Sequence, residues 1–203
     1  MRSGKKTALW MGAASGGAVA VAGLVISLLG SGPDGLKMSL FVTGRIAFLL
    51  FWGAYAGPAL ASLFGPAFSP LKRHAREFGL AFASVIAVHV TIVAWLSLIG
   101  AAPGFGVFVR FGIALGWTML LAALSFGRPA QWFGASGWWA IRFVGMNYIL
   151  YAFATDFVHG PLSGGLVHVA EYLPFAVLSV AAPSVRAAAF LQRLGRSWRT
   201  ALG

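Results

Sequence analysis

Apolar residues occur in six long runs along the chain, and short stretches rich in glycine, proline or charge separate them. Each run holds roughly 20 residues, the length that a helix needs to cross the hydrocarbon core of a bilayer. The pattern predicts an all-α fold, a polytopic membrane helix bundle with about six transmembrane helices. The expected spans are 7–30, 39–63, 79–100, 105–125, 138–158 and 167–188.

Basic residues gather in alternate connecting stretches. If six spans alternate, one face of the membrane receives Arg2, Lys5, Lys6, Lys72, Arg73, Arg76, Arg128, Arg186, Arg193, Arg196 and Arg199. The opposite stretches, SGPDGLK, AAPGF and HGPLSGG, carry one lysine. Because lysine and arginine are retained on the cytoplasmic side, both termini are expected to be cytoplasmic.

Composition narrows the class of protein further. The chain is 59% hydrophobic and 9% charged, and its mean hydropathy is +0.84. Neither a GxGxxG turn between strand and helix nor a phosphate-binding loop occurs, so no flavin or nicotinamide domain is expected within the chain. The absence of cysteine excludes disulfides and iron–sulfur clusters. The net charge is +11, and the charged residues lie mainly between the apolar runs. Membrane lipid is therefore the expected partner, and nucleic acid is not.

The organisation predicted from these patterns is a single transmembrane domain over residues 1–203. The tail 189–203 alternates apolar and basic residues at helical spacing, so we expect an amphipathic helix on the cytoplasmic surface. GxxxG spacings occur at Gly12 and Gly16 and at Gly53 and Gly57. Such spacings let helix backbones approach closely.

Histidines supply the candidate chemistry. His89 lies in the middle of 79–100, where an imidazole needs an internal partner or a metal. His159 follows span 138–158, and two histidines on separate helices can hold one iron. Their nominal offset of roughly 16 Å along the helix axis counts against the pair, and either ring can instead hydrogen-bond a neighbouring helix. His74, in the basic LKRHARE stretch, is expected to be solvated, and His168 to lie at the membrane interface.

Two motifs resemble a known family. TGRIAFLLFWGAYAGPAL (43–60) is similar to the TG-x-W-A-L-x-x-L-L opening of a helix in the ferric reductase-like transmembrane domain. The closest branch is the MsrQ type, the haem-b membrane subunit that serves a periplasmic methionine sulfoxide reductase. Its R-R-x-L-G-L loop is followed by a histidine at a fixed spacing, and Arg76, Gly79 and His89 match this pattern, with Ala75 and Phe78 as departures. The resemblance implies a ferric reductase-like core at about 40–188.

A second motif concerns the other ligands. The family carries L-H-x-L-x-Y and a later histidine, where this chain has MNYILYAFATDFVH (146–159). Tyr151 matches the tyrosine and His159 the later histidine within one position, whereas Asn147 replaces the first histidine. The resemblance therefore implies one haem b, ligated by His89 and His159. A second site would use His74 with Met146 or Asn147.

The resemblance also implies a function. Electrons would come from a separate cytoplasmic donor, a flavin reductase with FMN or a quinol, and leave to an acceptor protein or metal outside. Arg45 and Arg110, inside spans two and four, are natural partners for haem propionates, or they extend to lipid headgroups. The chain would then be an oxidoreductase component of the cell membrane, expected to be a bacterial inner membrane. The alternative is a small transporter or structural membrane protein whose histidines only bond between helices.

Overall fold

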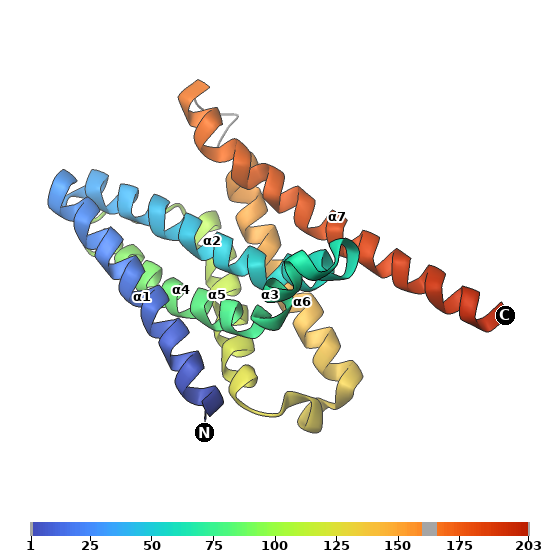
Figure 1. Cartoon of the computed structure of the whole chain (residues 1–203). Coiled ribbons are helices and arrows are strands. Elements are labelled where there is room, and N and C mark those ends of the chain that lie inside the picture. The colour runs from blue at the N-terminus through green and yellow to red at the C-terminus, as the bar shows by residue number, and fades with distance from the viewer. Residues whose placement is uncertain (1, 160–165, 203) are drawn as a thin grey trace. The chain divides into compact units, whose positions relative to one another are not determined.

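The described residues are almost entirely helical (Figure 1). The computed structural model describes residues 2–159 and 166–202, and side chains at 4–158 and 166–196. Over these residues the chain forms α-helices and one short 3-10 helix and no strand, which confirms the all-α prediction. The elements are α1 (Arg2–Leu29), α2 (Pro33–Phe64), η1 (Pro66–Phe68), α3 (Ser69–Arg73), α4 (Ala75–Leu98), α5 (Phe105–Phe126), α6 (Pro129–His159) and α7 (Leu166–Leu202).

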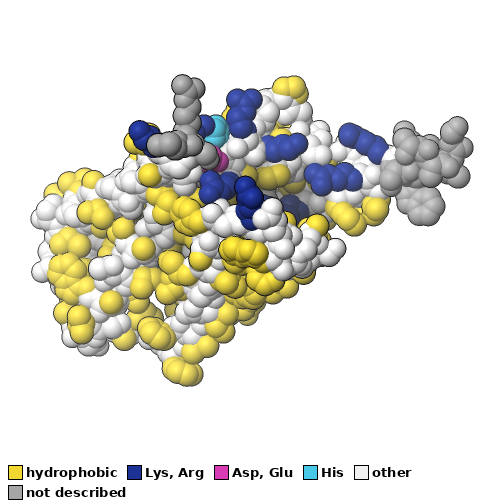
Figure 2. Space-filling model, turned by 90° about the horizontal axis from the view of Figure 1, so that it is seen from below, with side chains coloured by type: hydrophobic (Ala, Val, Ile, Leu, Met, Phe, Trp, Pro, Cys, Tyr) yellow, Lys and Arg dark blue, Asp and Glu magenta, His cyan; other side chains and the backbone are white. Residues whose placement is uncertain are grey.

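Five described helices, α1, α2, α4, α5 and α7, are long and apolar enough to cross a membrane. Figure 2 shows many hydrophobic side chains on the surface, as lipid contact requires. The chain is therefore a multi-pass membrane protein. The remaining expected span, 138–158, lies within α6, which is 31 residues long but is not among the five. Arg142, Asn147 and Asp156 make this stretch more polar than the others.

Glycine and proline determine where the helices begin and end. Gly30 and Gly100 follow α1 and α4 with φ of 84° and 79°, in the left-handed region that a side chain disfavours. The Gly30 amide donates to the Ile26 carbonyl at 2.8 Å and so closes the last turn of α1. Pro33 and Pro129 open α2 and α6, where a proline loses no helical hydrogen bond.

The described helices form two compact units. The first comprises Met1–Phe51 with Glu77–Ala152, and the second comprises Trp52–Arg76 with Phe153–Gly203. α2 thus contributes to both units, and 56% of its most apolar window is buried, against 11% for α1. The expectation of one transmembrane domain over 1–203 stays a prediction.

In the first unit, α1, α2 and α4 pack together. One buried cluster joins Ala22 of α1, Leu36 of α2, and Ile92 and Leu96 of α4. Nearer the start of α4, the Ser84 hydroxyl oxygen lies 3.1 Å from the Met11 carbonyl oxygen of α1. Residues later in α1 contact residues later in α4, so the two helices run parallel. Residues later in α2 contact residues earlier in α4, so α2 runs antiparallel to both.

α5 and α6 pack in the same unit at a glycine. A Cβ at Gly145 of α6 would lie 2.8 Å from Cε3 of Trp117 and 3.0 Å from Cδ1 of Leu121, both on α5. The Tyr148 hydroxyl is 3.5 Å from the Arg110 carbonyl oxygen, on the same side of the pair. Gly145 therefore permits a close approach of these helices.

In the second unit, the end of α2 packs against α7 and α3. The Trp52 indole N–H donates to the Leu178 carbonyl at 3.0 Å, in the turn before Pro183 of α7. Gly57 faces α3, where a Cβ on it would lie only 2.8 Å from the Leu71 Cβ atom. The Phe157 ring of α6 contacts the Phe175 ring of α7, with centroids 5.3 Å apart.

One expectation about packing is corrected. Gly12 and Gly16 face open space rather than another described helix, whereas Gly57 marks a close backbone approach. The tail 189–203 is helical through Leu202, where it continues α7 without a break, and its place on the cytoplasmic surface stays a prediction. Pro183 is tolerated inside α7, where it removes one main-chain hydrogen bond.

Candidate functional site

His89 lies near the middle of α4 on the side that faces α2. Val85 and Ile92, one turn before and after it, are buried, and His89 itself is half-buried. The apolar periodicity of 79–100 turns this face inward, because residues one turn apart share a face of a helix. An imidazole is therefore held within the helix packing, as the sequence predicted.

Thr43 of α2 positions the His89 ring. The ring Nδ1 is 2.9 Å from the Thr43 hydroxyl oxygen, and Thr43 is fully buried. At the neighbouring Gly44, a Cβ would lie 3.5 Å from the His89 Cε1 atom, an ordinary contact. Among the described residues, Thr43 is the hydrogen-bond partner of His89, and none bonds Nε2.

Thr43 ends a short column of hydroxyl groups along α2. Its hydroxyl donates to the Ser39 carbonyl at 2.8 Å, and the Ser39 hydroxyl donates to the Gly35 carbonyl at 2.8 Å. Ser39 also approaches the Ala22 carbonyl of α1 at 3.4 Å. Because both residues are fully buried, these bonds satisfy groups that would otherwise be costly in an apolar setting.

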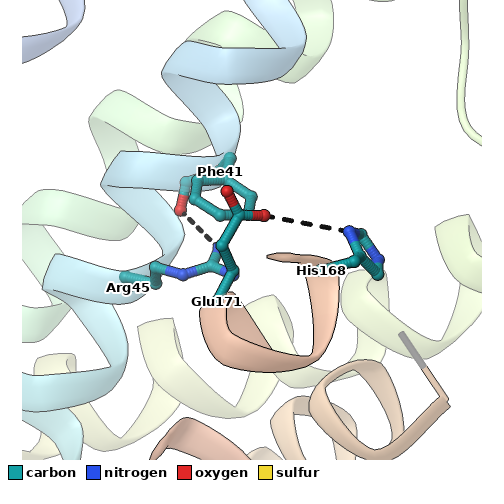
Figure 3. Close-up of polar contacts among 4 residues, drawn as sticks. All are labelled: Phe41, Arg45, His168 and Glu171. Carbon is teal, nitrogen blue, oxygen red and sulfur yellow. Dashed lines mark hydrogen bonds and ion pairs between the residues drawn. The ribbon is translucent and has the colours of Figure 1, made fainter. Parts of the chain in front are cut away.

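The two predicted propionate partners lie on α2 and α5. The Arg45 guanidinium folds back along its own helix, where it donates to the Phe41 carbonyl at 3.0 Å and lies 3.1 Å from the Phe41 ring centroid (Figure 3). The hydrogen bond and the ring contact offset part of the free-energy cost of placing the guanidinium charge in hydrocarbon. Arg110 is half-buried on α5. Their role toward a propionate stays a prediction.

Met146 and Asn147, the alternative ligands on α6, are both half-buried. The Asn147 amide donates to the Phe143 carbonyl one turn earlier at 2.7 Å. The helix that carries Asn147 therefore supplies a hydrogen-bond acceptor for its amide, at the position where the motif of the ferric reductase-like domain has a histidine.

The remaining histidines belong to the second unit. His159 is the last residue of α6, and its side chain lies outside the described residues. His168, in the first turn of α7, has Nδ1 3.8 Å from a Glu171 carboxylate oxygen, as Figure 3 shows, and packs on the Tyr172 ring. This ion pair needs a protonated His168, and both side chains are too exposed for it to stabilise the fold much.

His74 corrects an expectation. The sequence predicted a solvated loop, but η1 and α3 occupy this stretch, and His74 caps the end of α3. Its amide donates to the Pro70 carbonyl at 3.0 Å. The side chain is half-buried, and its Nδ1 atom is buried. The prolines at 66 and 70 favour such short helices, because each fixes φ near the start of a turn.

No group of three or more acidic or histidine side chains within the described residues could hold a metal ion. Haem iron would need at most two protein ligands, so the haem prediction does not depend on such a group. Comparisons with protein-family models, with curated proteins and with solved structures gave no match.

Sequence reasoning missed the partner of His89. In the sequence Thr43 and Gly44 stand out only as part of a motif, and Ser39 belongs to none. A signal was present, because two hydroxyl residues one turn apart in an apolar run mark the polar side of a buried helix.

Proposed function

We propose that the chain binds one haem b through His89 and carries electrons across the cell membrane, which we take to be a bacterial inner membrane. The observation that supports this most is the state of the His89 ring. Its Nδ1 is fixed by Thr43, while Nε2 carries no hydrogen bond from the described residues. Histidines that bind metals commonly use one ring nitrogen for the metal and the other for such a bond.

The surroundings of His89 support this proposal. His89 offers one imidazole nitrogen inside an apolar helix packing, and a haem ring needs apolar walls. Held by His89 and His159, a haem b would supply one-electron redox chemistry. The chain itself would hold the imidazole still and exclude water around it.

The second ligand in the proposal is His159, which rests on the sequence resemblance. His74, His168, Met146 and Asn147 are the alternatives, and of these His168 already faces a carboxylate and Asn147 its own helix. Arg45 and Arg110 would supply charge to the propionates. Because we propose no flavin domain within the chain, the donor is a separate cytoplasmic flavin reductase or a quinol, and the acceptor lies outside.

A second function is favoured by one contact. The Thr43–His89 bond joins α2 to α4, so His89 already has the internal partner that a membrane histidine needs. In that case the chain is a non-redox membrane protein or small transporter. His89 then makes an interhelical hydrogen bond that stabilises the fold by about 0.6 kcal/mol or somewhat more.

A haem spectrum separates the two functions. We would purify the full chain in detergent from haem-replete cells and record the reduced-minus-oxidised difference spectrum together with the haem-to-protein ratio. The proposal predicts a b-type spectrum and a ratio near one. A well-folded protein without a Soret band would refute it and leave the non-redox function.

Substitution identifies the ligand. His89→Ala should abolish the band, and Thr91→Ala is a matched control, because Thr91 is an exposed residue of α4 whose hydroxyl bonds its own helix at 3.0 Å. Circular dichroism would show that each variant remains helical. A band that survives in His89→Ala would assign the iron to another residue, and His159→Ala would be tested in the same way.

A further inference from the structure

The hydrogen-bond donor between Thr43 and His89 can be assigned from distances. A threonine hydroxyl has one hydrogen. The Thr43 hydroxyl oxygen lies 2.8 Å from the Ser39 carbonyl oxygen, which can only accept. The 2.9 Å contact with the His89 ring must then be a bond that Thr43 accepts. The ring therefore carries its hydrogen on Nδ1.

The opposite assignment is less favourable. If the Thr43 hydroxyl donated to a bare Nδ1, the 2.8 Å contact between Thr43 and Ser39 would be lost as a hydrogen bond. Ser39 donates in the same way to Gly35 at 2.8 Å, so both hydroxyls of α2 bond backward along their own helix. The Nδ1–H tautomer satisfies the Thr43 and His89 contacts together.

We infer that Thr43 is a positioning residue that holds His89 as the Nδ1–H tautomer and leaves the Nε2 lone pair for an electron-pair acceptor. The ring also lies beside Gly44 of the same helix, with Cε1 3.5 Å from the position a Cβ would take there. The part that concerns iron rests on the proposed function. The tautomer does not, because it follows from protein contacts alone.

The inference has a consequence for the proposed ligand. An imidazole whose Nδ1–H is hydrogen-bonded is a stronger electron donor through Nε2 and has a fixed ring orientation. Removal of the acceptor should weaken haem binding by about 10-fold, at the lower end of the range known for such supporting residues. It should also raise the midpoint potential, since the oxidised iron loses some electron donation.

The test begins with haem-free protein labelled with ¹⁵N-histidine. The His89 resonances are assigned by their loss in His89→Gln. In the wild type, Nδ1 should be protonated and Nε2 should resonate far downfield as a bare nitrogen. Thr43→Ser keeps the acceptor and should give the same pattern. Thr43→Val has the same shape without the acceptor and should shift His89 toward the Nε2–H tautomer.

The second readout uses haem-loaded protein. Thr43→Ser should have a haem affinity and a midpoint potential close to those of the wild type. Thr43→Val should bind haem about 10-fold more weakly and have a higher midpoint potential. An Nε2–H tautomer in the wild type, or retention of the Nδ1–H tautomer in Thr43→Val, overturns the inference. The predicted tautomers in a protein that never binds haem would support the role of Thr43 and overturn the proposed function.

Discussion

Gly57 is the position where one added methyl group should disturb the second unit most directly. In Gly57→Ala the new Cβ would lie 2.8 Å from the Leu71 Cβ and 3.2 Å from the Leu71 carbonyl carbon and oxygen. These atoms belong to the backbone or the first side-chain carbon, so they cannot rotate away. Over-packing of this kind costs about 1–3 kcal/mol.

Gly44→Ala on the same helix is the matched control. Its Cβ would make an ordinary contact of 3.5 Å with His89 Cε1. Both substitutions gain the same helix propensity, up to about 1 kcal/mol, so that term cancels when the two variants are compared. Gly57→Ala should therefore be less stable than Gly44→Ala by about 1–3 kcal/mol. At about 2–4 °C per kcal/mol, the Tm difference in detergent should be about 2–12 °C.

Pro58 also disfavours a Cβ on the residue before it, so the Leu71 contact must be separated from this effect. The cost of Gly57→Ala is measured again in a Leu71→Gly background, where the Cβ that it would meet is gone. Our reasoning requires a smaller cost there. An equal cost in both backgrounds, or equal Tm values for the two alanine variants, would refute the assigned contact.

Two other predictions concern α6 and α7. Reporters fused after Arg128 and after His159 should report opposite sides of the membrane if α6 crosses it, and two reports from the same side would leave five crossings and place the termini on opposite faces. Trp52→Phe should lower the free energy of unfolding by about 0.5–1.5 kcal/mol through loss of the hydrogen bond to Leu178. The Tm of this variant is compared with that of Trp95→Phe, which changes an exposed tryptophan on α4. Equal losses in the two variants would contradict the role of that bond.

The sequence predicted the fold well because apolar run length is a direct physical requirement of a bilayer. Spans 79–100 and 105–125 correspond to α4 and α5 within a few residues. The failures have local causes. Gly12 and Gly16 have the spacing for close packing, but spacing does not say which face of a helix meets a neighbour. The stretch around His74 contains prolines that favour short helices. Its many charged residues instead predict a solvated loop, and this prediction was wrong.

The candidate site was predicted only in part. The position of His89 followed from its place in an apolar run, but its partner required knowledge of the register between α2 and α4. That register is set by contacts such as Leu36 with Leu96 and Phe51 with Phe82, whose rings lie 5.3 Å apart. No local pattern encodes such pairings, because they depend on how two apolar faces fit together.

Whether α6 crosses the membrane decides the direction of the proposed electron transfer. Its polar residues are unevenly placed, since Arg142 and Asp156 lie near the two ends of 138–158 and 143–155 carries no charge. Charges near the ends of a span cost far less than charges at its centre, because long side chains reach the interface. Arg128 before α6 and the basic residues at the end of α7 also fall on one side only if the helix crosses. These charges favour six crossings over the five that apolarity alone identifies, and in the proposed function the donor would then meet the same face as both termini.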